Sequence, residues 1–482
     1  MRIITLSLFS VLAFAATSFS QQVVSMTYQG AKTKAQITNM FGLPLFKCGA
    51  DYYQMTYTSV DAKGNLDTLS GLVAIPDDPS ATYPVLMYEH GTSACKTCVP
   101  SRYGQSGGDE GQAALMFSGM GYVALLPDYV GMGDGRGFQT YVHAGTSVSA
   151  SEDMLKAFRA WAPDNDVLIN QQLFITGYSQ GGYASMAFHR YMQETYGEQT
   201  VTAAAHNSGP YSLSGAMRDL ILVDSAYSYP AYIPNTMLGM NEVYEMYTDI
   251  NEFFNPEYTQ DIQKYYDGDI SLTTLNARII DTLVAYNGAS VAHHMIKNNV
   301  LLEITNNPSY IINQILRDND VYKWQPKSPT RIFYCKADDQ VPYVNSIIAL
   351  DTMYAEGADP NLVKAVDVDS TLNHTGCVTP AFTQTILFFA GFQSTTLATT
   401  TIENGDLHIY PNPVNDKFYV KGDVTDEMTI SIWDLNGKLM MYGQSINAID
   451  GIDVSSFENG IYVIQLKMAN GNVSYQKISV RK

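Results

Sequence analysis

The apolar positions in the middle of the chain form short runs, and helix-like stretches follow some of them. The run Leu173–Thr176 precedes a helix-like stretch from Tyr183 to Tyr191. Comparable runs occur at 122–126, 331–335 and 362–368. Short apolar runs bounded by turn residues are typical of buried strands. Their alternation with helical segments predicts an α/β domain.

The end of the chain changes to a period-two alternation of apolar and polar residues. A Thr-rich linker, predicted over 392–405, is followed by short alternating runs that are separated by Asn-Gly and Glu-Asn-Gly turns. The runs lie at 417–420, 428–433, 460–466 and 473–480. This pattern predicts a small all-β sandwich over 406–482, separate from a larger domain over 21–391.

More than a hundred residues separate the strand candidate at 201–206 from the one that begins at Arg331. Because a connection between neighbouring strands needs far fewer residues, we expect an inserted helical cap over about 211–330. Its Tyr, Met and Phe side chains could line an acyl or aromatic pocket. They could equally form the core of the cap itself.

The segment Gly177-Tyr178-Ser179-Gln180-Gly181 lies between the predicted strand and the predicted helix. A G-x-S-x-G sequence in a strand, turn and helix is the context of a nucleophile elbow, in which a strained backbone exposes the serine. Glycine is expected at both ends because a larger side chain would collide with the strand or the helix. A turn without chemistry is the alternative, since the motif is common. We predict Ser179 as the nucleophile.

A serine nucleophile needs a base, and the base needs a carboxylate to orient it. Of the eight histidines, only His374 and His408 follow a plausible acid, and His408 lies in the predicted sandwich. His374 is therefore the predicted base, in a polar loop before a helix over 382–392. Asp338 is the predicted acid because it lies in a loop after a strand, with Asp339 as the alternative. Either aspartate could instead cap a helix over 344–356.

The oxyanion of an acyl-transfer intermediate needs two backbone N–H donors. The amide of Gln180, directly after the nucleophile, is one candidate. The second should come from the loop after the strand that begins at Pro84, where Gly91 or Thr92 is expected and Thr92 is preferred. His90 in the same loop is interpreted as structural.

Two other motifs give no further site. The glycine-rich turn after Asp128 lacks the Lys-Ser/Thr of a phosphate-binding loop, so Asp128 is expected to organise the loop. The pair His293-His294 has no acidic or cysteine ligand at helical spacing. We predict neither a metal nor a cofactor.

Several blocks resemble the secretory lipase family of α/β-hydrolases, and fungal lipase A-type enzymes are similar in them. The blocks are His90-Gly91-Thr92, Cys98-Val-Pro-Ser101, Pro127-Asp-Tyr-x-Gly131-x-Gly133, Gly177-Tyr-Ser-Gln-Gly-Gly182 and Ser208-Gly-Pro-Tyr211. The resemblance covers about residues 45–395. It implies an α/β-hydrolase fold and ester hydrolysis by a Ser179/Asp338/His374 triad under a helical lid, with a small-molecule or lipid ester as substrate.

The C-terminal segment resembles the sorting domain of the type IX (Por) secretion system. The matching blocks are Ile409-Tyr-Pro-Asn-Pro413, Trp433-Asp-Leu-Asn-Gly-Lys438, Ile452-Asp-Val-Ser455, Gly460-Ile-Tyr462 and Lys477-Ile-x-Val480. The resemblance implies contact with the secretion machinery and passage to the cell surface or the medium. A carbohydrate-binding sandwich is the alternative.

Composition agrees with an exported protein. Residues 1–20 carry one basic residue, a short apolar core and small residues, which predicts a signal peptide. The formal net charge of −19 argues against nucleic acid as a partner. Five cysteines in an exported chain suggest one or two disulfides. Cys95 and Cys98 could pair with each other, or either could pair with Cys48 or Cys377, whereas Cys335 is expected to be buried and free.

Three functions are compatible with these residues. The first is a secreted serine lipase or carboxylesterase. The second is a serine peptidase of the prolyl-oligopeptidase type, which shares the order of the triad, although no group that would hold a peptide terminus is evident. The third is a non-catalytic surface binding protein, which is disfavoured because all three triad positions are filled in the right order.

Overall fold

The computed structural model describes most of the chain. The described residues are 21–42, 45–105, 109–394, 396–397, 408–421, 428–434, 439–446, 451–468 and 473–482. The predicted signal peptide and much of the predicted linker lie outside them. The chain divides into two units, Met1–Thr395 and Thr396–Lys482, and each is described by itself.

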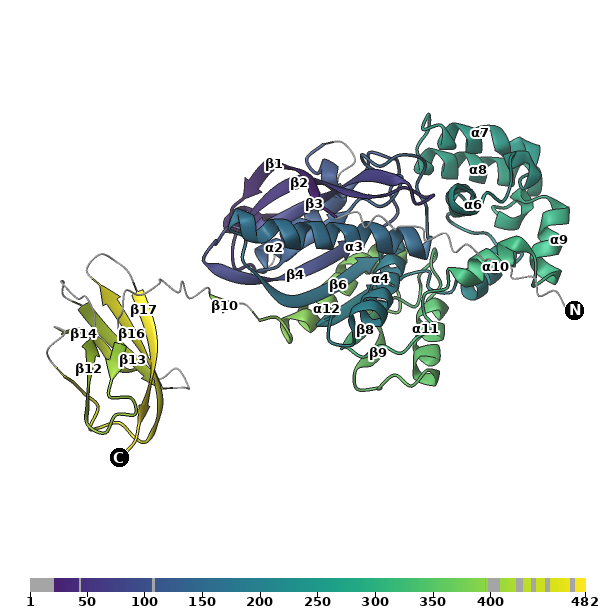
Figure 1. The fold of residues 1–482 in the computed structure, drawn as a ribbon. Helices are drawn as coiled ribbons and strands as arrows, with labels where there is room; N and C mark the ends of the chain where they lie inside the picture. Colours follow the sequence, from purple (N-terminus) through teal and green to yellow (C-terminus); the bar gives the residue numbers. More distant parts are fainter. Residues whose placement is uncertain are drawn as a thin grey trace, which may run out of the picture. The chain divides into compact units, whose positions relative to one another are not determined.

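A mixed sheet forms the centre of the first unit (Figure 1). Its strand order is β1-β2-β3-β5-β4-β6-β7-β8-β9. The strands are β1 Val23–Lys32, β2 Ala50–Val60, β3 Leu66–Pro76, β4 Ala81–Glu89, β5 Val123–Pro127, β6 Ile169–Tyr178, β7 Ala203–Asn207, β8 Thr330–Tyr334 and β9 Val363–Asp367. The pairs from β1 to β5 are antiparallel, and those from β5 to β9 are parallel. The carboxyl ends of the parallel strands therefore meet at one edge.

Helices cover both faces of this sheet. They are α1 Lys34–Phe41, α2 Gln112–Gly119, α3 Ala144–Trp161, α4 Gln180–Tyr196, α11 Val344–Ala355 and α12 His374–Ala390, with short 3-10 turns η1 Pro100–Arg102, η2 Asp109–Gly111 and η3 Ala162–Asn165. Alternate residues of β6 point to opposite faces. Leu173 and Ile175 pack in one core with α3, α4 and α11, and Phe174 packs in another with α2 and α12.

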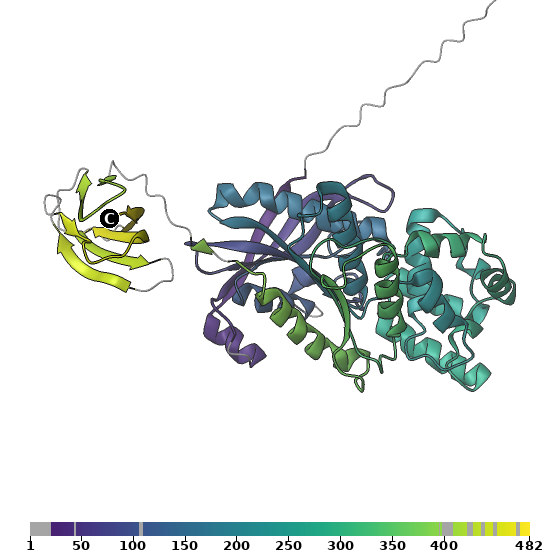
Figure 2. The ribbon, with the colours of Figure 1, turned by 90° about the horizontal axis from the view of Figure 1, so that it is seen from below.

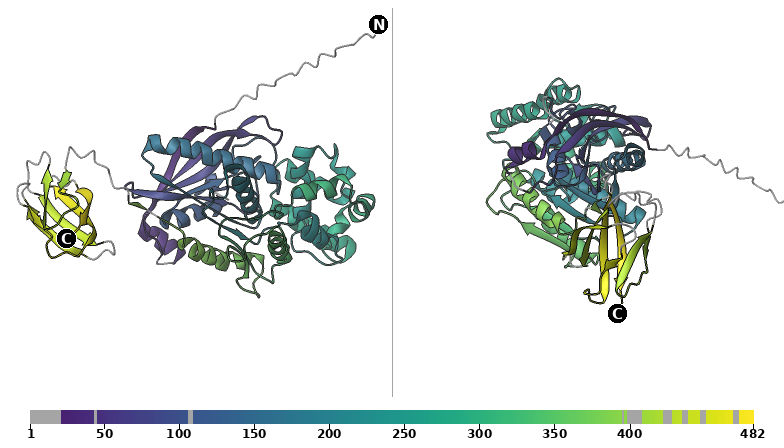
Figure 3. Two further views of the ribbon diagram at one scale, coloured as in Figure 1. Left: turned by 60° about the horizontal axis from the view of Figure 1, so that its bottom comes forward. Right: turned by 90° about the vertical axis from the view of Figure 1, so that its left-hand side faces the viewer.

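Between β7 and β8 the chain forms a helical cap, which confirms the predicted insertion. Its elements are the π-helical turn η4 Leu213–Met217, α5 Arg218–Leu222, α6 Tyr232–Tyr244, η5 Ile250–Glu252, α7 Pro256–Tyr266, α8 Leu272–Asn287, η6 Ala292–Met295, α9 Asn298–Asn306 and α10 Ile311–Asp318. The teal cap helices lie together at one end of the first unit in Figure 1, Figure 2 and Figure 3. Local signals fix their ends: Ser271 caps α8 by accepting from the amide of Thr274, and Gly288 ends it with φ 77°.

The second unit contains two small antiparallel sheets, as the period-two pattern predicts. One has the order β11-β12-β15 and the other β14-β13-β16-β17. The strands are β11 His408–Tyr410, β12 Lys417–Lys421, β13 Met428–Asp434, β14 Leu439–Ile446, β15 Ile452–Asp453, β16 Gly460–Met468 and β17 Val473–Val480. The two-residue β10, Thr396–Leu397, belongs to neither of these sheets. Phe418, Ile430 and Ile464 contribute to a core that both sheets share. The predicted sandwich is confirmed.

Candidate active site

Ser179 lies in a tight turn between β6 and α4, with φ 59° and ψ −121°. This left-handed backbone is costly for a residue with a side chain. The flanking glycines allow it, because a Cβ at Gly177 would lie 2.3 Å from the carbonyl oxygen of Gly181, and a Cβ at Gly181 would lie 1.9 Å from that of Glu89. Any other residue at these two positions would push β4, β6 and α4 apart.

The structure brings the three predicted triad residues together. His374 Nε2 lies 2.9 Å from Ser179 Oγ, and His374 Nδ1 lies 2.7 Å from Asp338 Oδ2. All three are nearly enclosed, with exposed fractions of 8% for Ser179 and 6% for His374, and 1% for the Asp338 side chain. The geometry suits a neutral imidazole that donates Nδ1–H to the carboxylate and accepts the serine proton at Nε2.

Asp338 is held by its own loop. Its Oδ1 accepts hydrogen bonds from the amides of Gln340 at 3.0 Å and Val341 at 2.8 Å, which is the turn-forming behaviour of aspartate. The other oxygen remains for His374. Neither aspartate caps α11, whose N-cap residue is Tyr343 without a side-chain hydrogen bond.

His374 is the first residue of α12, so the prediction of a polar loop that leads to a helix at 382 is wrong. Asn373 is the N-cap, and its side chain accepts from the amide of Gly376. This cap starts the helix before the apolar residues that signalled it in the sequence. Pro380 lies inside α12, where it cannot donate the helical hydrogen bond to the carbonyl oxygen of Gly376.

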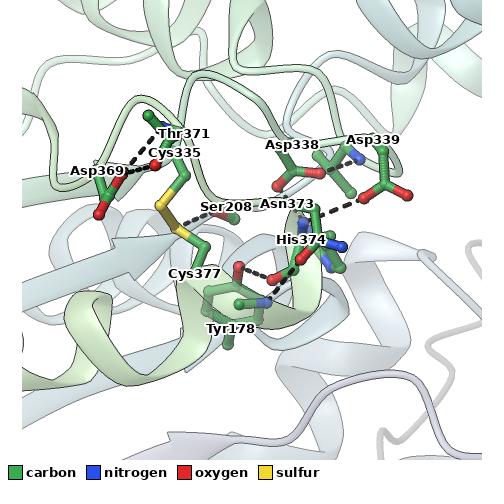
Figure 4. The surroundings of a disulfide bond; sticks show 12 residues. Tyr178, Ser208, Cys335, Asp338, Asp339, Asp369, Thr371, Asn373, His374 and Cys377 are labelled. Carbon is green, nitrogen blue, oxygen red and sulfur yellow. Dashed lines mark hydrogen bonds and ion pairs between the residues drawn. A yellow bond between two sulfur atoms is a disulfide. The ribbon is translucent and has the colours of Figure 1, made fainter.

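Two contacts that the sequence did not predict fix the backbone of His374 (Figure 4). The Asp339 carboxylate accepts from the His374 amide at 3.1 Å, and the Tyr178 hydroxyl donates to the His374 carbonyl oxygen at 2.6 Å. Asp339, the alternative acid, therefore contacts the backbone of the histidine and not its ring. The position of Asp339 directly after Asp338 was the one feature of the sequence that drew attention to this carboxylate.

A disulfide joins the end of β8, which leads into the loop of the acid, to the first turn of α12, which carries the base. Cys335 lies three residues before Asp338, Cys377 lies three residues after His374, and the two cysteines are bonded (Figure 4). The expectation that Cys335 is free is wrong, because the end of β8 lies directly against the first turn of α12. Cys95 pairs locally with Cys98, and Cys48 is the free cysteine.

The predicted oxyanion donors lie at the start of α4 and in the loop after β4. Gln180 begins α4, and the first amides of a helix have no partner within it. Gly91 and Thr92 follow β4, and the Thr92 hydroxyl lies 3.0 Å from the hydroxyl of Tyr141. His90 is completely enclosed, with Nδ1 2.7 Å from the carbonyl oxygen of Gly91, and burial lowers its pKa. Its contacts fit the expected structural role.

Asp128 joins three segments behind the site. Its Oδ1 accepts from the amide of Ser101 at 3.0 Å, and its Oδ2 accepts from the hydroxyl of Ser70 at 2.6 Å. Burial raises the pKa of Asp128 to about 6, and these hydrogen bonds offset only part of the rise. Asp128 organises loops, as expected, but it bonds distant segments and not its own turn.

Glu89 at the end of β4 is a second buried carboxyl near the elbow. Burial raises its pKa from 4.5 to about 8, against a hydrogen bond from the Ser151 hydroxyl at 2.7 Å. The folded protein therefore holds Glu89 protonated at neutral pH, whereas the unfolded chain ionises it.

We expect the substitution Glu89→Gln to remove this pH dependence. Because the folded pKa lies above the unfolded one, the stabilisation is complete below about pH 4.5 and is lost as the pH rises through 8. Relative to the variant, the wild type should lose a few kcal/mol of unfolding free energy between pH 5 and pH 9, at about 1.4 kcal/mol per pKa unit. Urea denaturation at both pH values measures the difference, with the exposed Glu257→Gln as control. If the unfolding free energies of the wild type and Glu89→Gln differ by the same amount at pH 5 and pH 9, the prediction is contradicted.

An apolar cavity opens at Ser179 beneath the cap. Besides Ser179, residues of η4, α5, α6, α9 and α10 and of several loops line it, and almost all of them are hydrophobic. They include Leu213, Met217, Ile221, Met237, Ile304 and Leu316. An acyl chain made of methylene groups could therefore bind there without burying polar groups of the protein.

Comparisons with known proteins agree with this architecture. The family described as "Secretory lipase" matches residues 114–383, and the "Secretion system C-terminal sorting domain" matches residues 408–481. No curated protein sequence matches the chain. Within the part of the chain that the structure describes, no helix has the length and apolar character needed to cross a bilayer.

Solved structures show the α/β-hydrolase fold of the first unit. A hydrolase from Legionella pneumophila aligns with a TM-score of 0.67 and 22% identity over 77% of this chain and 98% of its own. The rice cell wall degrading esterase LipA from Xanthomonas oryzae aligns with 0.66 and 23% over 77% and 96%. Candida antarctica lipase A in its closed state aligns with 0.55 and 15% over 79% and 84%.

Proposed function

The chain belongs to the secretory lipase family, and from that premise we propose that it hydrolyses carboxylic esters with apolar acyl chains through an acyl-enzyme on Ser179. The sorting domain at residues 408–481 directs the protein by type IX secretion to the cell surface or the extracellular space. The observation that carries the proposal is the Ser179–His374–Asp338 hydrogen-bond chain at the floor of an apolar cavity.

In the acylation step, Ser179 Oγ attacks the ester carbonyl carbon while its proton moves to His374 Nε2. The imidazolium that forms is stabilised by Asp338 at Nδ1, 2.7 Å away. His374 then gives the proton to the departing alcohol. A water molecule attacks the acyl-enzyme by the same route, releases the acid and restores Ser179.

The amides of Gln180 and Thr92, or of Gly91, are proposed to hold the oxyanion. Gln180 supplies a free N–H at the start of α4, where the helix dipole also favours negative charge. The Thr92 side chain is engaged by Tyr141, which lines the cavity. This contact fixes the loop after β4 beside the position of the acyl group.

The test is a p-nitrophenyl ester series from acetate to palmitate, with aminoacyl and prolyl anilides measured in parallel. Burying one methylene contributes about 0.8 kcal/mol, so kcat/KM should rise about fourfold per methylene until the cavity is full. Greater activity on the anilides than on every ester would contradict the proposal and favour the peptidase.

We expect the substitution Ile221→Trp to move the preference toward shorter esters. Ile221 on α5 is half-buried and lines the cavity, so the larger side chain takes up volume there with little effect on the core. Hydrolysis of the longest accepted esters should fall about tenfold or more while acetate hydrolysis is retained. Leu220→Trp, on the same helix but away from the cavity, is the matched control. An unchanged chain-length profile in Ile221→Trp would show that acyl chains bind elsewhere.

A further inference from the structure

Asp224, His293 and His294 form a cluster of potential metal ligands in the cap. One ligand atom from each residue lies within 4.8 Å of the others, and within the described ranges this is the one such group of three or more His, Cys, Asp or Glu side chains. Only the histidine pair is visible in the sequence, because the carboxylate lies far from the two histidines along the chain. The fold supplies the acidic ligand that the His293-His294 pair lacks locally.

Both imidazoles carry a nitrogen without a partner. The Nδ1 atoms of His293 and His294 are enclosed and have no hydrogen bond among the described residues. The two rings lie close together, with centroids 4.6 Å apart and planes at 79°. Buried polar atoms in folded proteins are nearly always bonded. Two such atoms on neighbouring residues, with a carboxylate in the same cluster, indicate a ligand that accepts both lone pairs.

The backbone on both sides of the cluster is fixed. Ala226 forms an antiparallel bridge with Val291, and the Tyr227 amide donates to the carbonyl oxygen of Ser290 at 2.9 Å. The Asn255 side chain donates to the carbonyl oxygen of His294 at 2.9 Å. The segments that carry Asp224 and the histidines are therefore held together before any ion binds, which reduces the ordering that binding would require.

We propose that Asp224, His293 and His294 bind a divalent transition metal ion of the zinc type. Two imidazoles and one carboxylate suit Zn²⁺ and Co²⁺, whereas Ca²⁺ and Mg²⁺ prefer oxygen ligands throughout. Three protein ligands leave one tetrahedral position for water. The exposed carboxylate of Asp224 gives the ion a path from solvent.

The site has a consequence for the cavity. Leu222 lies two residues before Asp224, Ile296 lies two residues after His294, and both line the cavity at Ser179. A bound ion would tie these two walls together and restrain the cap around the acyl chain. The metal site itself is independent of the proposed esterase function, and only this restraint rests on it.

The experiment uses the purified chain after dialysis against EDTA. Titration with ZnCl₂ by calorimetry should give one equivalent per chain, and CoCl₂ should give visible absorption bands of a nitrogen-ligated, low-coordinate ion. Asp224→Asn, His293→Gln and His294→Gln should each weaken binding about tenfold or more. Asp281→Asn, an exposed aspartate on α8, should bind as the wild type does.

Two outcomes would overturn the proposal: no saturable binding of either ion to the wild type, or unchanged affinity in Asp224→Asn and in the double variant His293→Gln/His294→Gln. Asp224 is exposed, so its variant should fold even if a histidine variant does not. Because calorimetry and absorption need no ester, a failed metal site and a failed esterase are told apart. The ester series with and without Zn²⁺ then tests the restraint on the cap.

Discussion

Replacing Ser179 by alanine is expected to lower kcat for ester hydrolysis about 10⁶-fold while the protein remains folded. The loss is large because Ser179 and His374 act as one unit, and removing either stops acyl-enzyme formation. The 2.9 Å contact between Ser179 Oγ and His374 Nε2 is the geometry on which this rests. Single-turnover kinetics with a p-nitrophenyl ester measures the rate, and pre-steady-state kinetics with excess ester shows the absence of an acyl-enzyme burst.

Matched variants separate the three roles. His374→Ala should lose about as much as Ser179→Ala, and the double variant little more, because the effects are not additive. Asp338→Asn should lose about 10⁴-fold, since the asparagine favours the wrong tautomer of His374. Asp339→Asn should lose far less, because its oxygen can still accept from the His374 amide. Substantial ester hydrolysis by Ser179→Ala would refute the proposed mechanism, and a larger loss in Asp339→Asn than in Asp338→Asn would reverse the assignment of the acid.

The fold could be predicted where local sequence and global structure demand the same residues. At the elbow, Gly177 and Gly181 leave so little space that no other residue fits, so the motif is visible in one sequence. The same holds for the period-two strands of the C-terminal unit. The cap could be predicted as an insertion from its length, but its helices follow signals that are each weak alone, such as the Ser271 cap.

Contacts between distant loops could not be predicted in the same way. The partners of the His374 backbone, Tyr178 and Asp339, come from β6 and from the loop after β8. Cys335 looked like a buried strand residue, and nothing local showed that α12 begins against it. Asp224 joins two histidines only because the cap folds back on itself. Such pairings depend on the tertiary arrangement, about which the periodicity and spacing of residues in one sequence carry no information.

Removing the Cys335–Cys377 disulfide is expected to lower both stability and catalysis. The bond closes a loop with a sequence separation of 42 residues, for which chain entropy gives a loss of about 4 kcal/mol in the free energy of unfolding. It also clamps the loop of Asp338 to the first turn of α12, which carries His374. In Cys335→Ala/Cys377→Ala we therefore expect kcat to fall about tenfold or more with little change in KM, because a small displacement of either group is costly at the transition state.

The Cys95–Cys98 bond provides the matched control for this second prediction. It spans a sequence separation of only 3 residues and lies outside the triad loops, so Cys95→Ala/Cys98→Ala should change stability much less and leave kcat near the wild-type value. Urea denaturation gives the stability of each variant, and kinetics well below the lower Tm separates catalysis from unfolding. If the Cys335→Ala/Cys377→Ala protein is destabilised but keeps its full kcat, the hydrogen bonds from Tyr178 and to Asp339 suffice to hold His374. The disulfide would then stabilise the fold without positioning the base.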